Sequence, residues 1–425
     1  MFYQKILFII KNKELRKKFL IVIFLLVVFR LAAHIPIPGI RLEQMKGFFE
    51  QNQAFGLLNL FTGGALSNFS LVLLGLGPYI TATIILQLLT MIFPGLERLY
   101  KEEGEAGRRK FNQYARLLTI PLSIVEGYSM ILLFKKQGLI LEMPLSLMIS
   151  TLLTITAGAM FLMWLGELIS EQGIGNGISL LIFAGIVARV PLNIFEMAVS
   201  FQSSELVSYI IFFVLCIGII AGVVLINEAR RPIPVSFAKR IRGFKMYGGG
   251  TSFLPLSINP AGVIPIIFAL SVLLFFSMIF NYLATYEGIG AIVAKSMNDF
   301  FNNIWVHNAL YFLLVVVFTY FYTAVVFDPK VIAENLQKIG GFVKGVRPGL
   351  PTATYVKNIL HKVIFPGALA LGFIAVLPSF VNTLTGIGQF SFLIGGTSVL
   401  IIVSVVLETV RQVNSQLQMR EYDTF

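Results

Sequence analysis

Long apolar runs alternate with short polar segments along almost the whole chain. Runs of spanning length, judged against the ~17–25 residues with which a helix crosses a bilayer, occur near 19–38, 71–93, 114–134, 145–168, 177–198, 207–227, 259–284, 306–327, 359–380 and 390–410. This pattern predicts an all-α polytopic membrane protein with about ten transmembrane helices.

The apolar stretch from Ala54 to Phe93 is interrupted twice, by small and polar residues at 63–68 and by glycine and proline at 75–78. A backbone break at membrane depth is tolerated only where it packs inside protein or lines a cavity. We therefore expect a half-helix over about Phe55 to Leu66, a turn, and a full spanning helix that ends at Phe93. A periplasmic loop with one helical turn, followed by an ordinary span with a proline kink, fits the periodicity equally well.

Composition agrees with a membrane protein. Charged residues make up 13% of the chain, against about 25% in soluble proteins, and the mean hydropathy is +0.83. The net charge of +12 favours contact with anionic lipid, nucleic acid or acidic protein surfaces. The single cysteine, Cys216, excludes a disulfide framework.

Lysine and arginine residues predict the orientation. Segments expected on one side of the membrane hold 24 of them, and segments on the opposite side hold 5. The positive-inside rule then places both termini in the cytoplasm, in agreement with an even number of spans. We expect a multi-pass protein of the cytoplasmic (inner) membrane.

The ten spans divide into an N-terminal half, residues 1–198, and a C-terminal half, residues 199–425. Because five is odd, the second half enters the membrane inverted, and inverted halves form a pathway at their interface. No strong residue-level repeat links them, so the inverted repeat is inferred from topology. An ion-coupled secondary transporter with inverted repeats has the same topology.

Two long basic loops, 228–258 and 329–358, lie on the predicted cytoplasmic side. In the first loop, Ile233, Val235 and Phe237 alternate with polar or proline positions ahead of a glycine-rich turn, which predicts a projecting β-hairpin. Basic projections bind phosphate backbones or acidic protein faces. The positive-inside rule alone also accounts for the charge.

Motifs of catalytic, metal and cofactor sites are missing from the sequence. It has no GxxxxGK[ST], HExxH or GxSxG pattern, and its three histidines are widely separated. We therefore expect no enzyme activity, metal or cofactor. Glu126 is an ionisable residue within a span, where it would serve as a proton site or face a polar neighbour or partner.

Several longer motifs resemble the SecY family, the central subunits of bacterial protein-conducting channels. The resemblance runs from about Lys11 to Val413. It is carried by PIPG at 36–39, FTGGALSNFS at 61–70, LGLGPYITATIILQLL at 74–89, EGEAGRRK at 103–110, GELISEQGIGNGISLLIFAGIV at 166–187, NPAGVIPIIFA at 259–269, FYTAVVFDP at 321–329 and GGFVKGVRPG at 340–349.

The resemblance implies two inverted halves around a central pore, closed by a plug at about 55–68 and by a ring of apolar side chains. The plug residues would include Phe55, Asn59, Phe61, Gly63, Gly64 and Asn68. The pore ring would be Leu76, Ile80, Ile178, Ile182, Ile267 and Ile401. Leu76 departs from the isoleucine usual in the family but keeps the ring apolar.

The resemblance also implies a lateral gate and partner sites. The gate residues would be Thr81, Thr83, Gln87 and Asn259, with Gln87 and Asn259 as polar partners across the gate. Contacts to the ribosome and to the SecA motor ATPase would involve Lys239, Arg240, Arg242, Lys245, Lys344 and Arg347. At the tip of the first loop, Phe244-Lys245 departs from the paired arginines of many bacterial members.

Further partners follow from the same resemblance. They are SecE and SecG as small membrane subunits, signal peptides and nascent chains as substrates, and membrane lipid. A SecY-like channel passes unfolded secretory polypeptides across the membrane and releases transmembrane segments laterally into it.

Overall fold

Helices make up most of the described part of the chain. The structure, a computed structural model, describes residues 12–37, 59, 62–140, 144–199, 206–237, 240–242, 245–247, 250–283, 289–385 and 396–422. The long helices of the first half are α2 (Lys13–Ala32), α5 (Gly77–Ile92), α7 (Gly104–Lys136), α8 (Leu145–Glu171) and α9 (Gly177–Val199). Those of the second half are α10 (Leu206–Glu228), α11 (Ile264–Leu283), α13 (Ile304–Val326), α15 (Leu350–Thr385) and α17 (Gly396–Tyr422).

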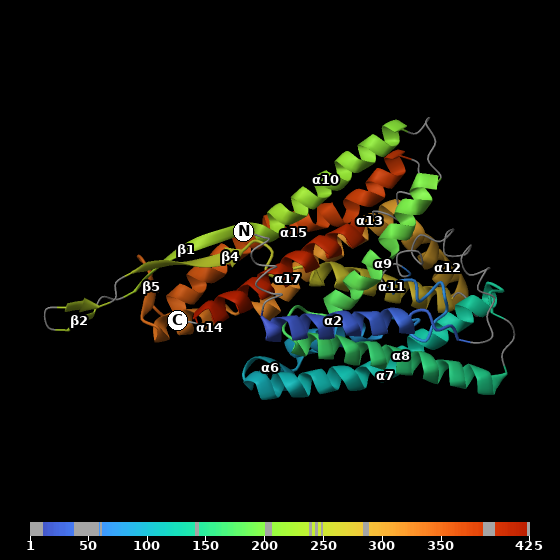
Figure 1. Cartoon of the computed structure of the whole chain (residues 1–425), viewed down its shortest axis with the longest axis horizontal. Coiled ribbons are helices and arrows are strands. Elements are labelled where there is room, and N and C mark those ends of the chain that lie inside the picture. The colour runs from blue at the N-terminus through green and yellow to red at the C-terminus, as the bar shows by residue number, and fades with distance from the viewer. Residues whose placement is uncertain are drawn as a thin grey trace.

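Each predicted span overlaps one of these helices, so the all-α polytopic architecture is confirmed. Three shorter helices lie between them in the described ranges: α6 (Pro94–Lys101), α12 (Ile289–Asn302) and α14 (Pro329–Lys338). In Figure 1, α12 lies at the end of the helices opposite to the strands.

Six of the described helices are long and apolar enough to cross a membrane by length and composition. Counting Gly77–Ile92 and Pro94–Tyr100, which are bent by 116° at their junction, as one span raises the number to seven. Gly177–Leu192 and Ile264–Ser277 are shorter apolar helices. Basic residues crowd the first turns of α2, which shortens its uncharged stretch.

Asparagine and aspartate side chains begin several helices. The Asn12, Asn176 and Asn303 side chains accept hydrogen bonds from backbone N–H groups in the first turns of α2, α9 and α13. Asp328 accepts one from the N–H of Lys330 at the start of α14. Each cap satisfies a donor that the helix itself leaves unpaired.

The segment before α5 differs from the prediction. Thr62–Phe69 and residues 71–76 form turns, so the end of the expected half-helix is not helical. Gly63, Gly64 and Gly75 have φ values of 67°, 87° and 58°, which a right-handed helix cannot include. The spanning helix therefore begins at Gly77, with Pro78 in its first turn.

The predicted hairpin in the first basic loop is confirmed. Strand β1 (Arg230–Phe237) pairs antiparallel with β4 (Thr251–Ser257). The strand β5 (Gly341–Val343) of the second basic loop pairs with the other edge of β1. A second hairpin of β2 (Arg240–Arg242) and β3 (Lys245–Tyr247) extends away from the helices at the left of Figure 1.

The small sheet is attached to the helices by its own apolar cluster. Ile233, Leu256 and Val343 are buried against Val356 in the first turns of α15. The alternation of buried and exposed positions along β1 explains why the sheet has one apolar face. The two basic loops thus form one folded unit.

Candidate functional site

A partly open apolar cavity lies where both halves of the chain meet. Together with the open space at its mouth, it has an empty volume of about 750 Å³. Its walls come from the turns before α5 and from α5, α7, α9 and α11. The lining residues are Thr62, Leu66, Leu74, Leu76, Gly77, Ile80, Thr81, Glu126, Met130, Ile182, Ile267, Leu270, Ser271 and Phe275.

Four of the residues expected in the pore ring line this cavity: Leu76, Ile80, Ile182 and Ile267. They come from the start of α5, from α9 and from α11, and each is at most 9% exposed. Ile401 of α17 is fully buried in the same large apolar cluster. The half-buried Ile178 packs against that cluster.

The segment expected to close the cavity is folded around Asn59. The Asn59 Oδ1 accepts a hydrogen bond from the backbone N–H of Ser67, at 2.9 Å, and the Thr62 hydroxyl donates to the Asn59 carbonyl oxygen. Thr62 and Leu66 of this segment line the cavity. Gly63 and Gly64 are buried and Asn68 is half-buried, whereas Phe55 and Phe61 lie outside the described residues.

Two of the expected gate residues use their hydroxyl groups within their own helix. Thr81 Oγ1 donates to the carbonyl oxygen of Gly77, and Thr83 Oγ1 donates to that of Tyr79. Gln87, on the same helix, is buried, and its Oε1 has no hydrogen-bond partner in the described part of the chain. Because α11 packs against both α5 and α7, these residues lie on a helix at the boundary of the two halves.

Asn259, the fourth expected gate residue, has partners other than Gln87. Its Nδ2 donates to Asn227 Oδ1 at 2.8 Å and to the carbonyl oxygen of Gly262 at 2.9 Å. The expected pairing of Gln87 with Asn259 is not found between these described side chains. The reason is geometric: Asn259 precedes α11, where the end of α10 brings Asn227 within reach.

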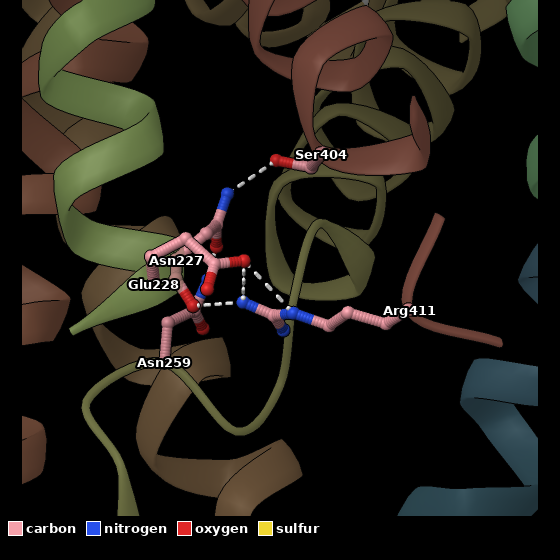
Figure 2. A network of polar contacts seen from close by, with 5 residues as sticks. All are labelled: Asn227, Glu228, Asn259, Ser404 and Arg411. Atoms are coloured by element: carbon pink, nitrogen blue, oxygen red, sulfur yellow. Dashed lines mark hydrogen bonds and ion pairs between the residues drawn. The ribbon is translucent and has the colours of Figure 1, made fainter. Parts of the chain in front are cut away.

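Figure 2 shows the polar network to which Asn259 belongs. Asn227 Nδ2 donates to Ser404 Oγ of α17 at 2.7 Å. The guanidinium of Arg411, also on α17, donates to Glu228 Oε1 and to the carbonyl oxygen of Asn227. The network therefore joins the end of α10, the segment before α11 and α17.

Glu126 lies in the cavity wall and faces a polar neighbour. It is 8% exposed, and its carboxyl group interacts with the Thr81 side chain across the α5–α7 contact. Among the residues that the structure describes, no group of three or more histidine, cysteine, aspartate or glutamate side chains is placed to hold a metal ion.

The basic residues expected to bind partners lie on the folded unit of the two loops. Arg240 and Arg242 are in β2 and Lys245 is in β3, whereas Lys239 falls outside the described residues. Lys344 follows β5 and is exposed. Arg347 is exposed as well, and its carbonyl oxygen accepts a hydrogen bond from Thr352 Oγ1 at 2.8 Å, which fixes the turn before α15.

Sequence reasoning missed the roles of three arginines that the fold places at contacts between distant segments. Arg30 contacts the turn at Gly63, Arg189 contacts Ser67, and Arg411 contacts Glu228. The positions of Arg30 and Arg189 within apolar spans could have indicated a polar contact for each, since an arginine within an apolar span needs a polar partner. The partner itself could not be read from the sequence.

Comparisons with known proteins identify the family. The model of the SecY family matches residues 70–410. The chain is 41% identical over 433 residues to the protein translocase subunit SecY of Streptomyces coelicolor, covering 98% of each chain. It is 40% identical over 434 residues to the SecY subunit of Aquifex aeolicus, covering 100% of this chain and 99% of the relative.

Solved structures support the same fold. A structure titled "The structure of a protein conducting channel" aligns with a TM-score of 0.64 and 21% identity, over 93% of this chain and 91% of the other. Sec61 in a canine ribosome–channel complex aligns with a TM-score of 0.60 and 20% identity, over 93% and 91% of the chains. Because its fold and its sequence both match over more than 90% of the chain, this chain belongs to the SecY family of protein translocase subunits.

Proposed function

We propose that this chain forms a protein-conducting channel in the cytoplasmic membrane, which passes unfolded secretory polypeptides across and releases transmembrane segments into lipid. The observation that carries the proposal is the apolar cavity between the halves, lined by Leu76, Ile80, Ile182 and Ile267. Membership of a family of translocase subunits supports it as well. We assign no catalytic role to the chain.

An apolar constriction suits a substrate of any sequence. No fixed polar site can recognise every side chain of an unfolded polypeptide, so a general channel avoids one. A narrow apolar passage excludes ions by dewetting yet yields to a passing chain. In this proposal Ile178 and Ile401 complete the ring, and the plug expected at about 55–68 closes it from outside.

A lateral opening follows from the way the halves meet. The contact of α11 with α5 and α7 joins the halves beside the cavity. Parting this contact would expose a path from the cavity to lipid, where an apolar segment of ~20 residues is more stable than in water. Thr81, Thr83, Gln87 and Asn259 are the gate residues of the proposal, and signal peptides bind there.

Partners and orientation follow from the basic folded unit. Its exposed Lys344 and Arg347 and the projecting β2–β3 hairpin support binding of the ribosome and of the SecA motor. A solved relative, Sec61, occurs in a ribosome–channel complex. We further propose SecE and SecG as membrane subunits, with both termini of this chain in the cytoplasm.

The ion-coupled transporter has less support. Such a transporter needs a polar site at the interface of its halves, but the described cavity there is lined mainly by apolar side chains, with Glu126 as its one ionisable lining residue. The matched relatives are translocase subunits.

The ring is tested by the ion conductance of the resting channel. Replacing Leu76, Ile80 and Ile182 together with serine should hydrate the constriction and raise the resting conductance of the translocase in planar bilayers several-fold. The matched control is Leu153→Ser on α8, because the Leu153 side chain is 62% exposed on the surface of the protein. An unchanged conductance in the triple variant would exclude these residues as the seal.

A further inference from the structure

Arg30, within the first span, reaches the segment that we propose as the plug. Its Nη1 donates a hydrogen bond to the carbonyl oxygen of Gly63 at 2.6 Å. Gly63 has a φ of 67°, and a Cβ there would lie 2.8 Å from the Arg30 Nη1 and 2.8 Å from the Cα of Gly185 on α9. The missing side chain of Gly63 is what allows both close approaches.

A second arginine reaches the same segment from another helix. Arg189 of α9 donates from its Nη2 to the Ser67 hydroxyl at 2.8 Å. A Cβ on Gly64, whose φ is 87°, would lie 2.9 Å from the Arg189 Nε and Nη2. The Gly63-Gly64 pair thus leaves room for one guanidinium at each residue.

These hydrogen bonds stabilise the segment more than hydrogen bonds on an exposed surface would. Ser67 is 4% exposed and both arginines are half-buried. A charged donor in an apolar surrounding gains a stronger hydrogen bond than a neutral donor does, and an arginine at membrane depth is costly without a polar partner. The segment therefore satisfies two charged groups, and they hold it in return.

We propose that Arg30 and Arg189 form a two-point latch that holds residues 62–68 in the closed position of the channel. The inference rests on the proposed role of this segment as a plug. The two arginines project from different helices, α2 and α9, onto one turn. A movement of the segment away from the cavity must break both contacts.

The latch is tested by the accessibility of Leu66, which is 1% exposed and lines the cavity. Leu66→Cys in a Cys216→Ser background, within the complete translocase in membranes, provides the reporter. A membrane-impermeant maleimide added from outside measures how often the segment leaves its place. Loss of one charged hydrogen bond should raise the labelling rate about 10-fold.

The variants are Arg30→Met and Arg189→Met, which keep an apolar stem without the charged donors. Lys135→Met is the matched control, since Lys135 is an exposed basic residue near the end of α7. We expect faster labelling in both arginine variants and an unchanged rate in the control. Unchanged labelling in both arginine variants would overturn the latch.

A double-mutant cycle separates a latch from a general loss of folding. Ser67→Ala removes the acceptor of Arg189 but leaves the arginine in place. If Arg189 acts through Ser67, Arg189→Met should accelerate labelling less in the Ser67→Ala background than in the parent. Fully independent effects would remove Arg189 from the latch.

Resting ion conductance of the same variants distinguishes this inference from the proposed function. Faster labelling with a higher conductance supports both the latch and the sealing role of the plug. Faster labelling with an unchanged conductance supports the latch, but it contradicts the sealing role that the proposed function gives to the plug.

Discussion

At the scale of single residues, glycines set how closely helices and turns approach around the cavity. A Cβ on Gly177, the first residue of α9, would lie 1.8 Å from the carbonyl oxygen of Gly166 on α8. The Gly177 N–H also donates to Ser170 Oγ at 2.9 Å. This contact fixes the start of α9, where the proposed ring residue Ile178 follows directly.

Gly177→Ala should therefore destabilise the protein. The added methyl group meets backbone, which cannot move without displacing α9 from α8, and such overpacking costs on the order of 1–3 kcal/mol. Thermal unfolding of the purified protein in detergent measures the effect. Gly218→Ala on α10 is the control, since a Cβ at Gly218 meets nothing within 4 Å; equal melting of the two variants would refute the packing argument.

Glu126 is the residue on which the channel and the transporter hypotheses differ most. Its carboxyl group lies in the cavity wall beside Thr81. Glutamine has nearly the same shape and can keep a hydrogen bond to a hydroxyl group, but it cannot carry a proton through a transport cycle.

Glu126→Gln should consequently translocate a secretory substrate within about twofold of the parent rate, a change of less than 0.5 kcal/mol. The measurement is protection of the substrate from protease in proteoliposomes. Glu126→Lys is the contrasting variant, since it leaves an unpaired cation in the cavity wall and should impair the protein. Abolished transport in Glu126→Gln would favour proton coupling.

At the scale of elements, the two basic loops act as one structural unit. Strand β1 of the first loop is the central strand between β4 and β5, so the second loop is held by the first. The turn after β5 then presents Arg347 with an exposed side chain, while Thr352 fixes its backbone. A basic and exposed turn is suited to binding an acidic or phosphate-rich partner.

Arg347→Glu should block motor-driven or ribosome-linked translocation without unfolding the protein. The side chain is exposed, so its reversal of charge changes the surface and leaves the apolar contacts of the sheet intact. Translocation rate and melting temperature are measured together. Lys330→Glu, an exposed basic position in the same loop, is the control; normal secretion in Arg347→Glu would remove Arg347 from the partner site.

At the scale of the whole molecule, two extensive sets of helix contacts join the halves in the described part of the chain. Helix α11 packs against α5 and α7, and α17 packs against α9. Beside the second contact, Gln416 Nε2 of α17 donates a hydrogen bond to the carbonyl oxygen of Gly173, in the segment between α8 and α9. In the proposed function, the contact of α11 opens while that of α17 holds the halves together.

Local patterns predicted much of this architecture. The apolar runs placed each long helix, and the alternation of Ile233 and Val235 predicted strand β1, because burial on one face imposes a period that the sequence must carry. The helix expected before Leu66 was wrong at its end, because Gly63 and Gly64 adopt the left-handed conformation, which the pattern of apolar residues does not reveal.

Local sequence patterns did not predict the contacts between segments that are distant in the sequence. Asn259 bonds to Asn227 and not to Gln87, and Arg189 bonds to a residue 122 positions away. Such partners are chosen by the packing of whole helices, which no short stretch of sequence encodes. The motif resemblance suggested which residues would form the ring, and the structure places four of them around one cavity.

Photocrosslinking tests whether an unfolded polypeptide passes through the apolar cavity. A secretory chain stalled in the translocase is probed with a photoreactive residue at position 80, 178 or 267. Control positions are 153 and 214, which face outward with 62% and 63% exposure. We expect adducts from the first three positions and none from the two controls. Adducts from the controls, with none from positions 80, 178 and 267, would contradict passage through the cavity.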